Sequence, residues 1–210
     1  MELQFYGANC LKITTKKSTI VIDDNLSDIG KKSITKLEDI ILITNQKAVN
    51  ALANKIVLNY PAEYEVGDVS IQGIAARSHL DSEAEGQSST IFKISTSDVR
   101  LLILGHIYPD LNEQQLEAIG TVDVLCIPVG GNGFTLDALG ALKCIKKIEP
   151  KIIIPTHYSV KGINYEVPQA TLEEVVKDLS MELSAPIERL KIKSADFGEA
   201  SGLVVLEVSN

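Results

Sequence analysis

Short apolar runs of strand-like composition recur along this chain, and each of its three histidines follows one of them. His79 follows the run at residues 69–78, His106 follows residues 99–105, and His157 follows residues 151–156. Strands of one sheet can bring residues that are distant in sequence to a common rim, where binding and catalytic groups concentrate. The pattern therefore predicts a sheet-based scaffold that gathers its histidines at one edge.

The order of the expected elements predicts two packed sheets with helices outside. Strands are expected first, at residues 3–6, 11–15, 19–23, 40–44, 55–58, 69–76, 89–95 and 99–104, with a short helix at 46–54. Later strands at 122–128, 151–154 and 203–208 alternate with helices at 112–119, 135–148 and 171–183, the first two beginning at Asn112 and Thr135 as N-caps. A meander followed by alternating elements is typical of one layered α/β or α+β domain, expected to span residues 1–210.

Composition narrows the classes of function. The 210 residues carry a net charge of −8, which disfavours nucleic-acid binding, and no apolar run reaches membrane-spanning length. The N-terminus lacks a basic segment followed by a long apolar one, so no secretory signal is expected. The cysteines are Cys10, Cys126 and Cys144, an odd number without a C-x-x-C pair. Buried, reduced thiols in a cytoplasmic protein are therefore expected.

Two interpretations of the histidines stay open. Three neutral imidazoles that leave a fourth position free are typical of a catalytic zinc site, and their long spacing requires tertiary convergence. The alternative is three unrelated histidines at loop mouths. Asp23, which ends a strand near the same rim with Asp24 after it, is either part of a solvated turn or a hydrogen-bond partner that orients a histidine.

A glycine-rich loop, Gly130-Gly-Asn-Gly133, lies between an expected strand and helix. It is neither a dinucleotide fingerprint nor a Walker loop, and the chain has no G-x-S-x-G nucleophile elbow. A tight turn is the favoured interpretation, with Asn132 or Gly133 at positive φ. Backbone N–H groups that hold an anion are the alternative.

Four segments carry a resemblance to a known family, namely residues 60–69, 111–120, 126–135 and 150–158. With them the chain resembles the metallo-β-lactamase superfamily, in the branch of simple metal-dependent hydrolases similar to sugar-phosphate lactonases. The resemblance runs from Leu3 to beyond Tyr158. It implies an α/β fold of the four-layer αββα sandwich type, with metal ions at one edge.

The metal motifs of the family are only partly present. Its T-H-x-H-x-D-H loop falls on residues 44–50, where the ligand positions hold Asn45, Lys47, Val49 and Asn50. The early Gly-His pair of the branch falls on Gly7-Ala8, and the bridging aspartate falls on His106. His79 and His157 correspond to family histidines, and Asp23 is kept with Asp24 in place of the following proline.

The resemblance thus leaves three candidate metal ligands and no carboxylate among them. We expect no metal pair, and we favour a non-catalytic or strongly altered homologue. The alternative is a mononuclear zinc-dependent hydrolase that uses water bound at His79, His106 and His157. The expected cofactor is therefore none or one divalent metal ion. Lys47 would repel a cation, attract a small anionic ligand or point to solvent. The predicted pocket comprises Asp23, Asn45, Lys47, Asn50 and Asn132.

Overall fold

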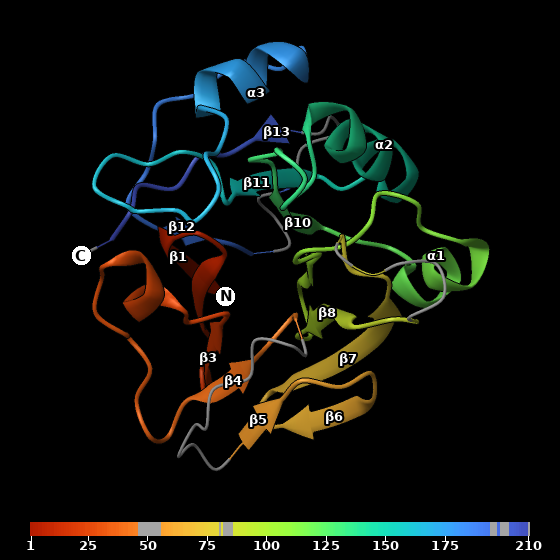
Figure 1. The fold of residues 1–210 in the computed structure, drawn as a ribbon. Coiled ribbons are helices and arrows are strands. Elements are labelled where there is room, and N and C mark those ends of the chain that lie inside the picture. Colours follow the sequence, from red (N-terminus) through yellow and green to blue (C-terminus); the bar gives the residue numbers. More distant parts are fainter. Residues whose placement is uncertain (46–55, 80, 82–85, 194–196, 198–201, 210) are drawn as a thin grey trace.

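The computed structural model describes residues 1–45, 56–79, 81, 86–193, 197 and 202–209, and these form two packed sheets (Figure 1). The first sheet has six strands in the order β12-β1-β2-β3-β4-β5. Strands β1, β2 and β3 form an antiparallel meander, whereas β3, β4 and β5 run parallel. Their bounds are β1 Glu2–Gly7, β2 Cys10–Thr14, β3 Thr19–Ile22, β4 Ile40–Leu42, β5 Ile56–Leu58 and β12 Leu190–Lys191.

The second sheet has seven strands in the order β13-β11-β10-β9-β8-β7-β6. Strands β6 to β9 are antiparallel, and β9, β10, β11 and β13 are parallel, so the last four end at the same edge. Their bounds are β6 Glu63–Val66, β7 Val69–Ala76, β8 Ser89–Ser95, β9 Arg100–Ile103, β10 Val124–Pro128, β11 Ile152–Thr156 and β13 Gly202–Leu203.

Burial follows the composition of the strands. Strands β4 and β10 are continuous apolar runs in which every residue is buried, as expected for strands covered on both faces. Strand β6 alternates charged and apolar residues, and it lies at the edge of its sheet. Strand β6 was not predicted because its two glutamates break the apolar run, and β12 was not predicted because it has only two residues.

Helix α1 (Glu113–Ile119) begins where the sequence predicted. The Asn112 side chain accepts a hydrogen bond from the Gln115 backbone, and the Gln115 side chain accepts one from the Asn112 backbone. This reciprocal pair is a capping box, which satisfies two N–H groups at the helix start. Gln115 Nε2 also donates to the Ala75 carbonyl of β7 at 2.7 Å. The same residue therefore caps the helix and ties it to the second sheet.

The predicted start of the second helix at Thr135 is wrong. Helix α2 (Ala138–Ile148) follows Asp137, whose side chain accepts from the Gly140 backbone N–H at 2.7 Å. The Thr135 hydroxyl is engaged elsewhere, because it accepts from the Gly131 N–H at 2.8 Å and closes the glycine-rich loop. In that loop Asn132 has a φ of 55° and Gly133 a φ of 74°, so the predicted left-handed turn is confirmed.

Helix α3 (Leu172–Asp178) lies within the helix predicted at 171–183 but ends earlier than expected. A capping box joins Thr171 and Glu174 at its start. The helix ends at Leu179, and Ser180 follows with a φ of 55°, a left-handed conformation that stops a helix. Within the described ranges, none of the helices has both the length and the apolar character needed to span a membrane.

One large apolar cluster joins the two sheets and the three α-helices. Helices α1 and α2 lie beside the seven-stranded sheet (Figure 1). A smaller cluster on the six-stranded sheet includes Val21 and Ile41, and it is covered by Leu26 and Ile29 of the 3-10 helix η1 (Leu26–Ile29). Two packed sheets with helices outside confirm the predicted α/β sandwich class. The helix predicted at 46–54 lies outside the described residues.

Two further expectations concern the thiols and the C-terminal strand. Cys10 and Cys126 are free and buried, as expected for thiols in apolar strand-like runs, and Cys144 of helix α2 is free and buried as well. The strand predicted at 203–208 is shorter, because only β13 forms a ladder, and the chain then makes isolated bridges, Leu206 to Ile187 and Val208 to Phe5. The C-terminal segment therefore contacts several elements rather than extending the seven-stranded sheet.

Candidate functional site

The three histidines follow strands whose ends meet at one rim. His106 comes three residues after β9, His157 directly follows β11, and His79 follows β7. The His79 backbone N–H donates to the His106 carbonyl at 3.2 Å, which places these two segments side by side. The parallel order of β9, β10 and β11 brings His157 to the same edge. The segments that carry the three histidines therefore meet at one rim of the fold.

Only two of the three rings face each other. The His106 and His157 ring centroids are 4.8 Å apart with an interplanar angle of 84°. Phe134 lies against both, at 5.0 Å from His106 and 5.6 Å from His157. The His79 ring instead faces Tyr108 at 6.3 Å, and its buried Nδ1 has no hydrogen-bond partner in the described structure. The His79 ring is near enough to His106 to lower its pKa, but it does not line the pocket beside the His106–His157 pair.

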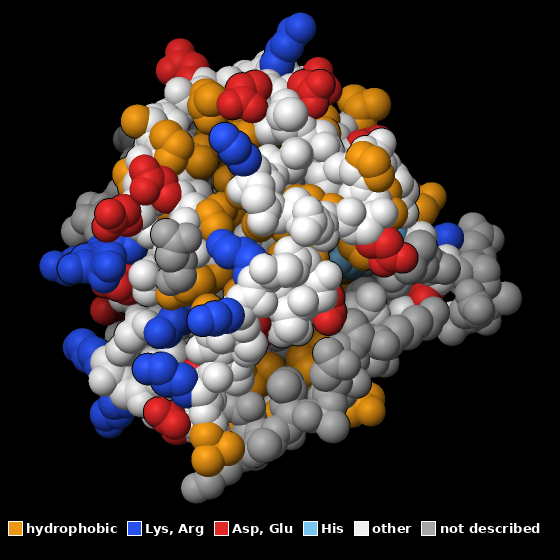
Figure 2. Space-filling view, turned by 60° about the vertical axis from the view of Figure 1, so that its left-hand side comes forward, with side chains coloured by type: hydrophobic (Ala, Val, Ile, Leu, Met, Phe, Trp, Pro, Cys, Tyr) orange, Lys and Arg blue, Asp and Glu red, His pale blue; other side chains and the backbone are white. Residues whose placement is uncertain are grey.

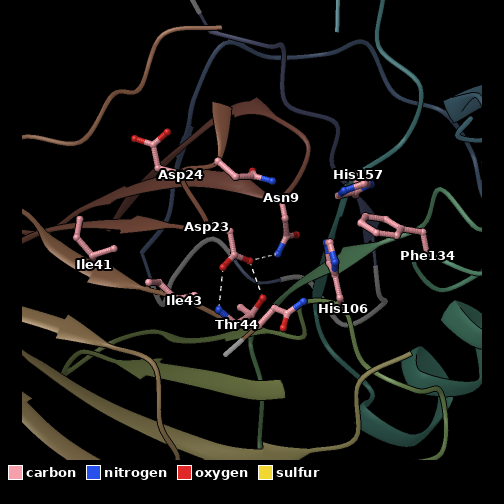
Figure 3. Close-up of a pocket in the computed structure, with 11 residues that line it drawn as sticks. Asn9, Asp23, Asp24, Ile41, Ile43, Thr44, His106, Phe134 and His157 are labelled. Atoms are coloured by element: carbon pink, nitrogen blue, oxygen red, sulfur yellow. Dashed lines mark hydrogen bonds between the residues drawn. The ribbon is translucent and has the colours of Figure 1, made fainter. Parts of the chain in front are cut away.

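A pocket of about 130 Å³ opens beside this pair (Figure 3). His106, His157 and Phe134 lie on one side of it, and the end of the six-stranded sheet forms the other. On the molecular face of Figure 2, histidine is visible only as a small area within a recess. We call this cavity the rim pocket; it is lined by Asn9, Asp23, Asp24, Asn25, Ile41, Ile43, Thr44, Asn45, His106, Phe134 and His157.

A hydrogen-bond network crosses the floor of the rim pocket. Asp23 Oδ1 accepts from the Thr44 N–H at 2.7 Å, and Oδ2 accepts from the Thr44 hydroxyl at 2.6 Å and Asn9 Nδ2 at 2.7 Å (Figure 3). Asn9 Oδ1 in turn accepts from the Thr156 hydroxyl of β11 at 2.8 Å. Asn9 lies in the turn between β1 and β2 and Thr44 follows β4, all in the first sheet, whereas Thr156 ends β11 of the second. The network therefore joins the two sheets at the rim.

The His157 ring is held in one tautomer by the loop that follows it. Gln169 Nε2 donates to the Val167 carbonyl at 2.6 Å, so Gln169 Oε1 is left as the acceptor that faces His157 Nδ1 at 3.2 Å. His157 Nδ1 must then carry the proton, and Nε2 carries a lone pair. Gly130 permits this arrangement, because a Cβ there would lie 2.0 Å from Gln169 Oε1.

Burial determines the charge states at the pocket. It lowers the pKa of His106 and of His157 to about 4. A smaller contribution comes from His79 in the case of His106 and from His106 in the case of His157. Both rings are therefore neutral at pH 7. Burial also raises the pKa of Asp23, although the hydrogen bonds from Thr44 and Asn9 oppose the increase by favouring the carboxylate.

Left-handed backbone concentrates at this rim. Ala8, Asp23 and His157 have φ values of 47°, 43° and 55°, which non-glycine residues seldom adopt. The His157 N–H donates to the Ala8 carbonyl at 2.7 Å, so two of the three residues are bonded to each other. Such strain persists only where surrounding contacts impose it, and it is common at functional sites. The rim is therefore a pre-shaped part of the fold.

The predicted pocket residues have different outcomes. Asp23 and Asn45 line the rim pocket. Asn132 does not, because it is exposed in the glycine-rich loop and donates to the Pro168 carbonyl. Lys47 and Asn50 lie outside the described residues. Asp23 contacts hydroxyl, amide and backbone donors, so it belongs neither to a solvated turn nor to a hydrogen bond with a histidine.

The polar residues that hold the site together were not predicted from the sequence. Asn9, Thr44 and Thr156 are 2%, 1% and 0% exposed. Thr44 and Thr156 each directly follow or end an apolar strand-like run, the same signal that identified the histidines. Asn9 had a weaker signal, since it lies in the turn between two strands where asparagine is common. Phe134 follows the glycine-rich loop, and nothing in the sequence placed its ring beside the histidines.

The described residues do not fit a metal pair. No group of three or more His, Cys, Asp or Glu side chains within the described part of the chain is arranged to hold an ion. Asp23 already accepts three hydrogen bonds, and positions 8 and 45 hold alanine and asparagine. The role of His79, His106 and His157 as ligands of a single ion stays a prediction.

The chain belongs to the β-lactamase superfamily, because the sequence profile of the β-lactamase superfamily domain matches residues 2–157. It is also similar to proteins named UPF0173 metal-dependent hydrolases. That of Lysinibacillus sphaericus is 25% identical over 198 residues, covering 76% of this chain and 86% of the relative. That of Carboxydothermus hydrogenoformans is 48% identical over 44 residues, covering 21% of this chain and 19% of the relative. In the first three relatives of this kind, the match spans only 19%, 38% and 28% of their length.

Solved structures support the same fold. A Thermotoga maritima protein of the metallo-β-lactamase superfamily superposes with a TM-score of 0.74 at 21% identity, covering 99% of this chain and 100% of that chain. This likeness establishes the arrangement of two sheets and helices. Placement in the sugar-phosphate-lactonase branch stays a prediction.

Proposed function

We propose that the protein is a non-catalytic binding member of the superfamily, whose rim is joined by hydrogen bonds instead of a metal pair. The observation that carries this proposal is the set of hydrogen bonds that the Asp23 carboxylate accepts. Both of its carboxylate oxygens accept hydrogen bonds, three in all, from Asn9 and Thr44. A carboxylate engaged in this way has little remaining capacity to hold a cation.

The remaining donors are too few for two divalent ions. His106 and His157 supply two neutral imidazoles at the rim pocket, and neutral ligands do not balance the charge of two cations. The segment 46–55, which contains Lys47 and Asn50, offers one ammonium and one amide at the family's ligand positions. Neither group is a usual metal ligand in proteins.

The rim pocket is also poorly suited to hydrolysis without a metal. Activation of water needs a general base whose pKa lies near the working pH. The pKa of His106 and of His157 is about 4, so each ring is neutral at pH 7 but only weakly basic. Asp23 is held by its three donors. A pocket that holds hydrogen-bond acceptors and only weak bases is better suited to binding a ligand than to hydrolysing one.

A mononuclear metal hydrolase is the second candidate, with a zinc-bound water at His79, His106 and His157. Two observations favour it. The UPF0173 relatives are named metal-dependent hydrolases, and His157 Nε2 has no hydrogen-bond donor among the residues that the structure describes. Against it, the His79 ring is turned toward Tyr108.

Metal analysis separates the two candidates. The protein would be purified on a resin without immobilised metal and without chelators, and zinc, iron, manganese and nickel would be measured per chain. We expect far less than one ion per chain, and a melting temperature that neither zinc nor a chelator changes. About one ion per chain, lost in each of His79→Ala, His106→Ala and His157→Ala, would favour the second candidate.

Turnover provides the independent readout. A nitrophenyl ester, a phosphodiester, a lactone and a thioester represent the substrate classes of the superfamily. We expect rates equal to those of the buffer. Hydrolysis that His157→Ala abolishes while the variant keeps its urea unfolding midpoint would refute the proposal of a non-catalytic protein.

A further inference from the structure

The carboxylates of the rim pocket are not available to a ligand. Asp23 already accepts three hydrogen bonds. Asp24 Oδ2 accepts four from residues 33–35, and Asp24 Oδ1 is enclosed by the protein. A cation would therefore find no carboxylate oxygen that is both reachable and unbonded, and an anion would be repelled by these carboxylates. The pocket favours an uncharged ligand.

Two imidazole rings supply polar atoms that a ligand can reach. Apart from the bond between His157 Nδ1 and Gln169, the ring nitrogens of His106 and His157 have no hydrogen-bond partner among the described residues. The enclosed side-chain atoms without a partner in the described structure belong to Asp24, Asn25, His79 and Thr90. Because His106 and His157 are not among these, their unpaired nitrogens are accessible, and both rings line the rim pocket.

The two rings together can donate and accept hydrogen bonds. His157 Nδ1 donates to Gln169, so His157 Nε2 is an acceptor. Burial keeps both rings uncharged at pH 7, so the His106 ring has one N–H donor and one acceptor nitrogen. The ring centroids are 4.8 Å apart, close enough for one small polar group to contact both. A hydroxyl group suits this pair, because it donates one hydrogen bond and accepts another.

The apolar lining favours a flat ring. Figure 3 shows Ile41 and Ile43 at one side of the pocket and Phe134 at the other, beside the imidazoles. The Phe134 ring centroid lies 5.0 Å from that of His106 and 5.6 Å from that of His157, so three rings form one wall. Aromatic rings pack well against a further ring. A cavity of about 150 Å³ accommodates benzene, so the rim pocket, at about 130 Å³, suits one six-membered ring.

We propose that the rim pocket binds a neutral phenol with a single ring. The phenol hydroxyl donates to His157 Nε2 and accepts from His106, and its ring packs between Phe134 and the two isoleucines. This inference rests on the proposed binding function and names its ligand class. It differs from the anionic ligand that the sequence suggested through Lys47, which lies outside the described residues.

Titration of the ¹⁵N-labelled, metal-free protein at pH 7, followed by NMR, tests the ligand class. The probes are phenol, toluene, benzoate and benzylammonium. Toluene has nearly the shape of phenol and is more hydrophobic, so tighter binding of phenol requires hydrogen bonds to its hydroxyl. We expect phenol to bind at least tenfold more tightly than the other three. Equal or tighter binding of any of these, or binding by none of the four, would overturn the proposal.

Two variants locate the binding. Phe134→Ala removes the aromatic wall and His106→Leu removes a polar partner, and both side chains are partly exposed in the structure. Phe134→Ala should weaken the binding of phenol and toluene alike, by at least fivefold. His106→Leu should weaken the binding of phenol alone. The control Tyr60→Ala removes a ring that is 60% exposed and lies outside the pocket, and it should change neither affinity. Phenol affinity unchanged in both pocket variants would refute this site.

The imidazole nitrogens provide a direct readout of the hydroxyl contact. Phenol should shift the ¹⁵N resonance of His157 Nε2, because that nitrogen gains a hydrogen-bond donor. The ring of His79 faces Tyr108 and does not line the pocket, so its nitrogen resonances should move much less. A His157 Nε2 resonance that stays in place at saturating phenol would contradict the proposed contact.

The two proposals fail in different ways. Bound metal or enzymatic turnover would refute the non-catalytic function, whatever the titrations show. Tighter binding of toluene or of either ion at the metal-free pocket would leave that function standing and refute only the ligand class. The urea unfolding midpoint of each variant shows whether lost binding comes from the site or from lost structure.

Discussion

Replacing Asn9 with alanine removes the link between Asp23 in one sheet and Thr156 in the other. The variant loses the 2.7 Å hydrogen bond from Asn9 Nδ2 to the Asp23 carboxylate. It also leaves the Thr156 hydroxyl, in a residue that is 0% exposed, without the acceptor it has at 2.8 Å. Both groups are too enclosed for water to replace the amide fully. The substitution should therefore destabilise the fold well beyond a surface change.

The magnitude follows from the two broken bonds. A hydrogen bond to a charged group contributes about 1.5–3 kcal/mol, and an unsatisfied buried hydroxyl costs about 1–3 kcal/mol. Their sum predicts a loss of about 2.5–6 kcal/mol in the free energy of unfolding for Asn9→Ala. Fewer donors on Asp23 should also raise the pKa of its carboxyl further, because those donors favour the charged form.

Urea unfolding followed by circular dichroism measures this loss, and Asn164→Ala at an exposed position is the matched control. Thr156→Val removes the orphaned hydroxyl, so it should cost less in the Asn9→Ala background than in the wild type. Such non-additivity is expected of residues in one network. A loss below about 1 kcal/mol, or strict additivity of the two changes, would refute the view that the network holds the sheets together.

Three further predictions concern other parts of the fold. Because burial lowers the pKa of His106 and His157 from 6.5 to about 4, the unfolded chain binds protons that the native protein does not bind in this range. The free energy of unfolding should be highest above pH 6.5 and should fall toward pH 4 by up to about 3 kcal/mol per ring, measured by urea unfolding at a series of pH values. The raised pKa of Asp23 opposes part of this loss. A free energy of unfolding that does not change with pH would contradict the prediction. Gly105→Ala should lower the free energy of unfolding by about 3 kcal/mol, because φ is +63° and a Cβ would lie 2.4 Å from the Thr44 Cβ. A shift of the urea unfolding midpoint no larger than that of an exposed Gly→Ala change would contradict this prediction. Asp137→Ala should cost about 1 kcal/mol through the lost helix cap, whereas an unchanged melting temperature would show that the cap is unimportant.

The sequence predicted most strands because their burial shows in their composition. Strands such as β7 (Val69–Ala76) and β8 (Ser89–Ser95) match the expected bounds, since apolar runs end there at polar or turn residues. The start of helix α2 was predicted at the wrong residue, because Thr135 and Asp137 are both good N-caps and only tertiary contacts decide between them. The Thr135 hydroxyl accepts a hydrogen bond from the Gly131 N–H in the loop, so Asp137 caps the helix instead.

The candidate site was predictable as a place but not as an arrangement. Strand ends correctly indicated the rim that carries His106 and His157. Ring orientation could not be read from the sequence, because it depends on tertiary neighbours such as Tyr108, whose ring lies 6.3 Å from that of His79. The buried network was also hidden, since Asn9 belongs to a residue type that is usually exposed in turns.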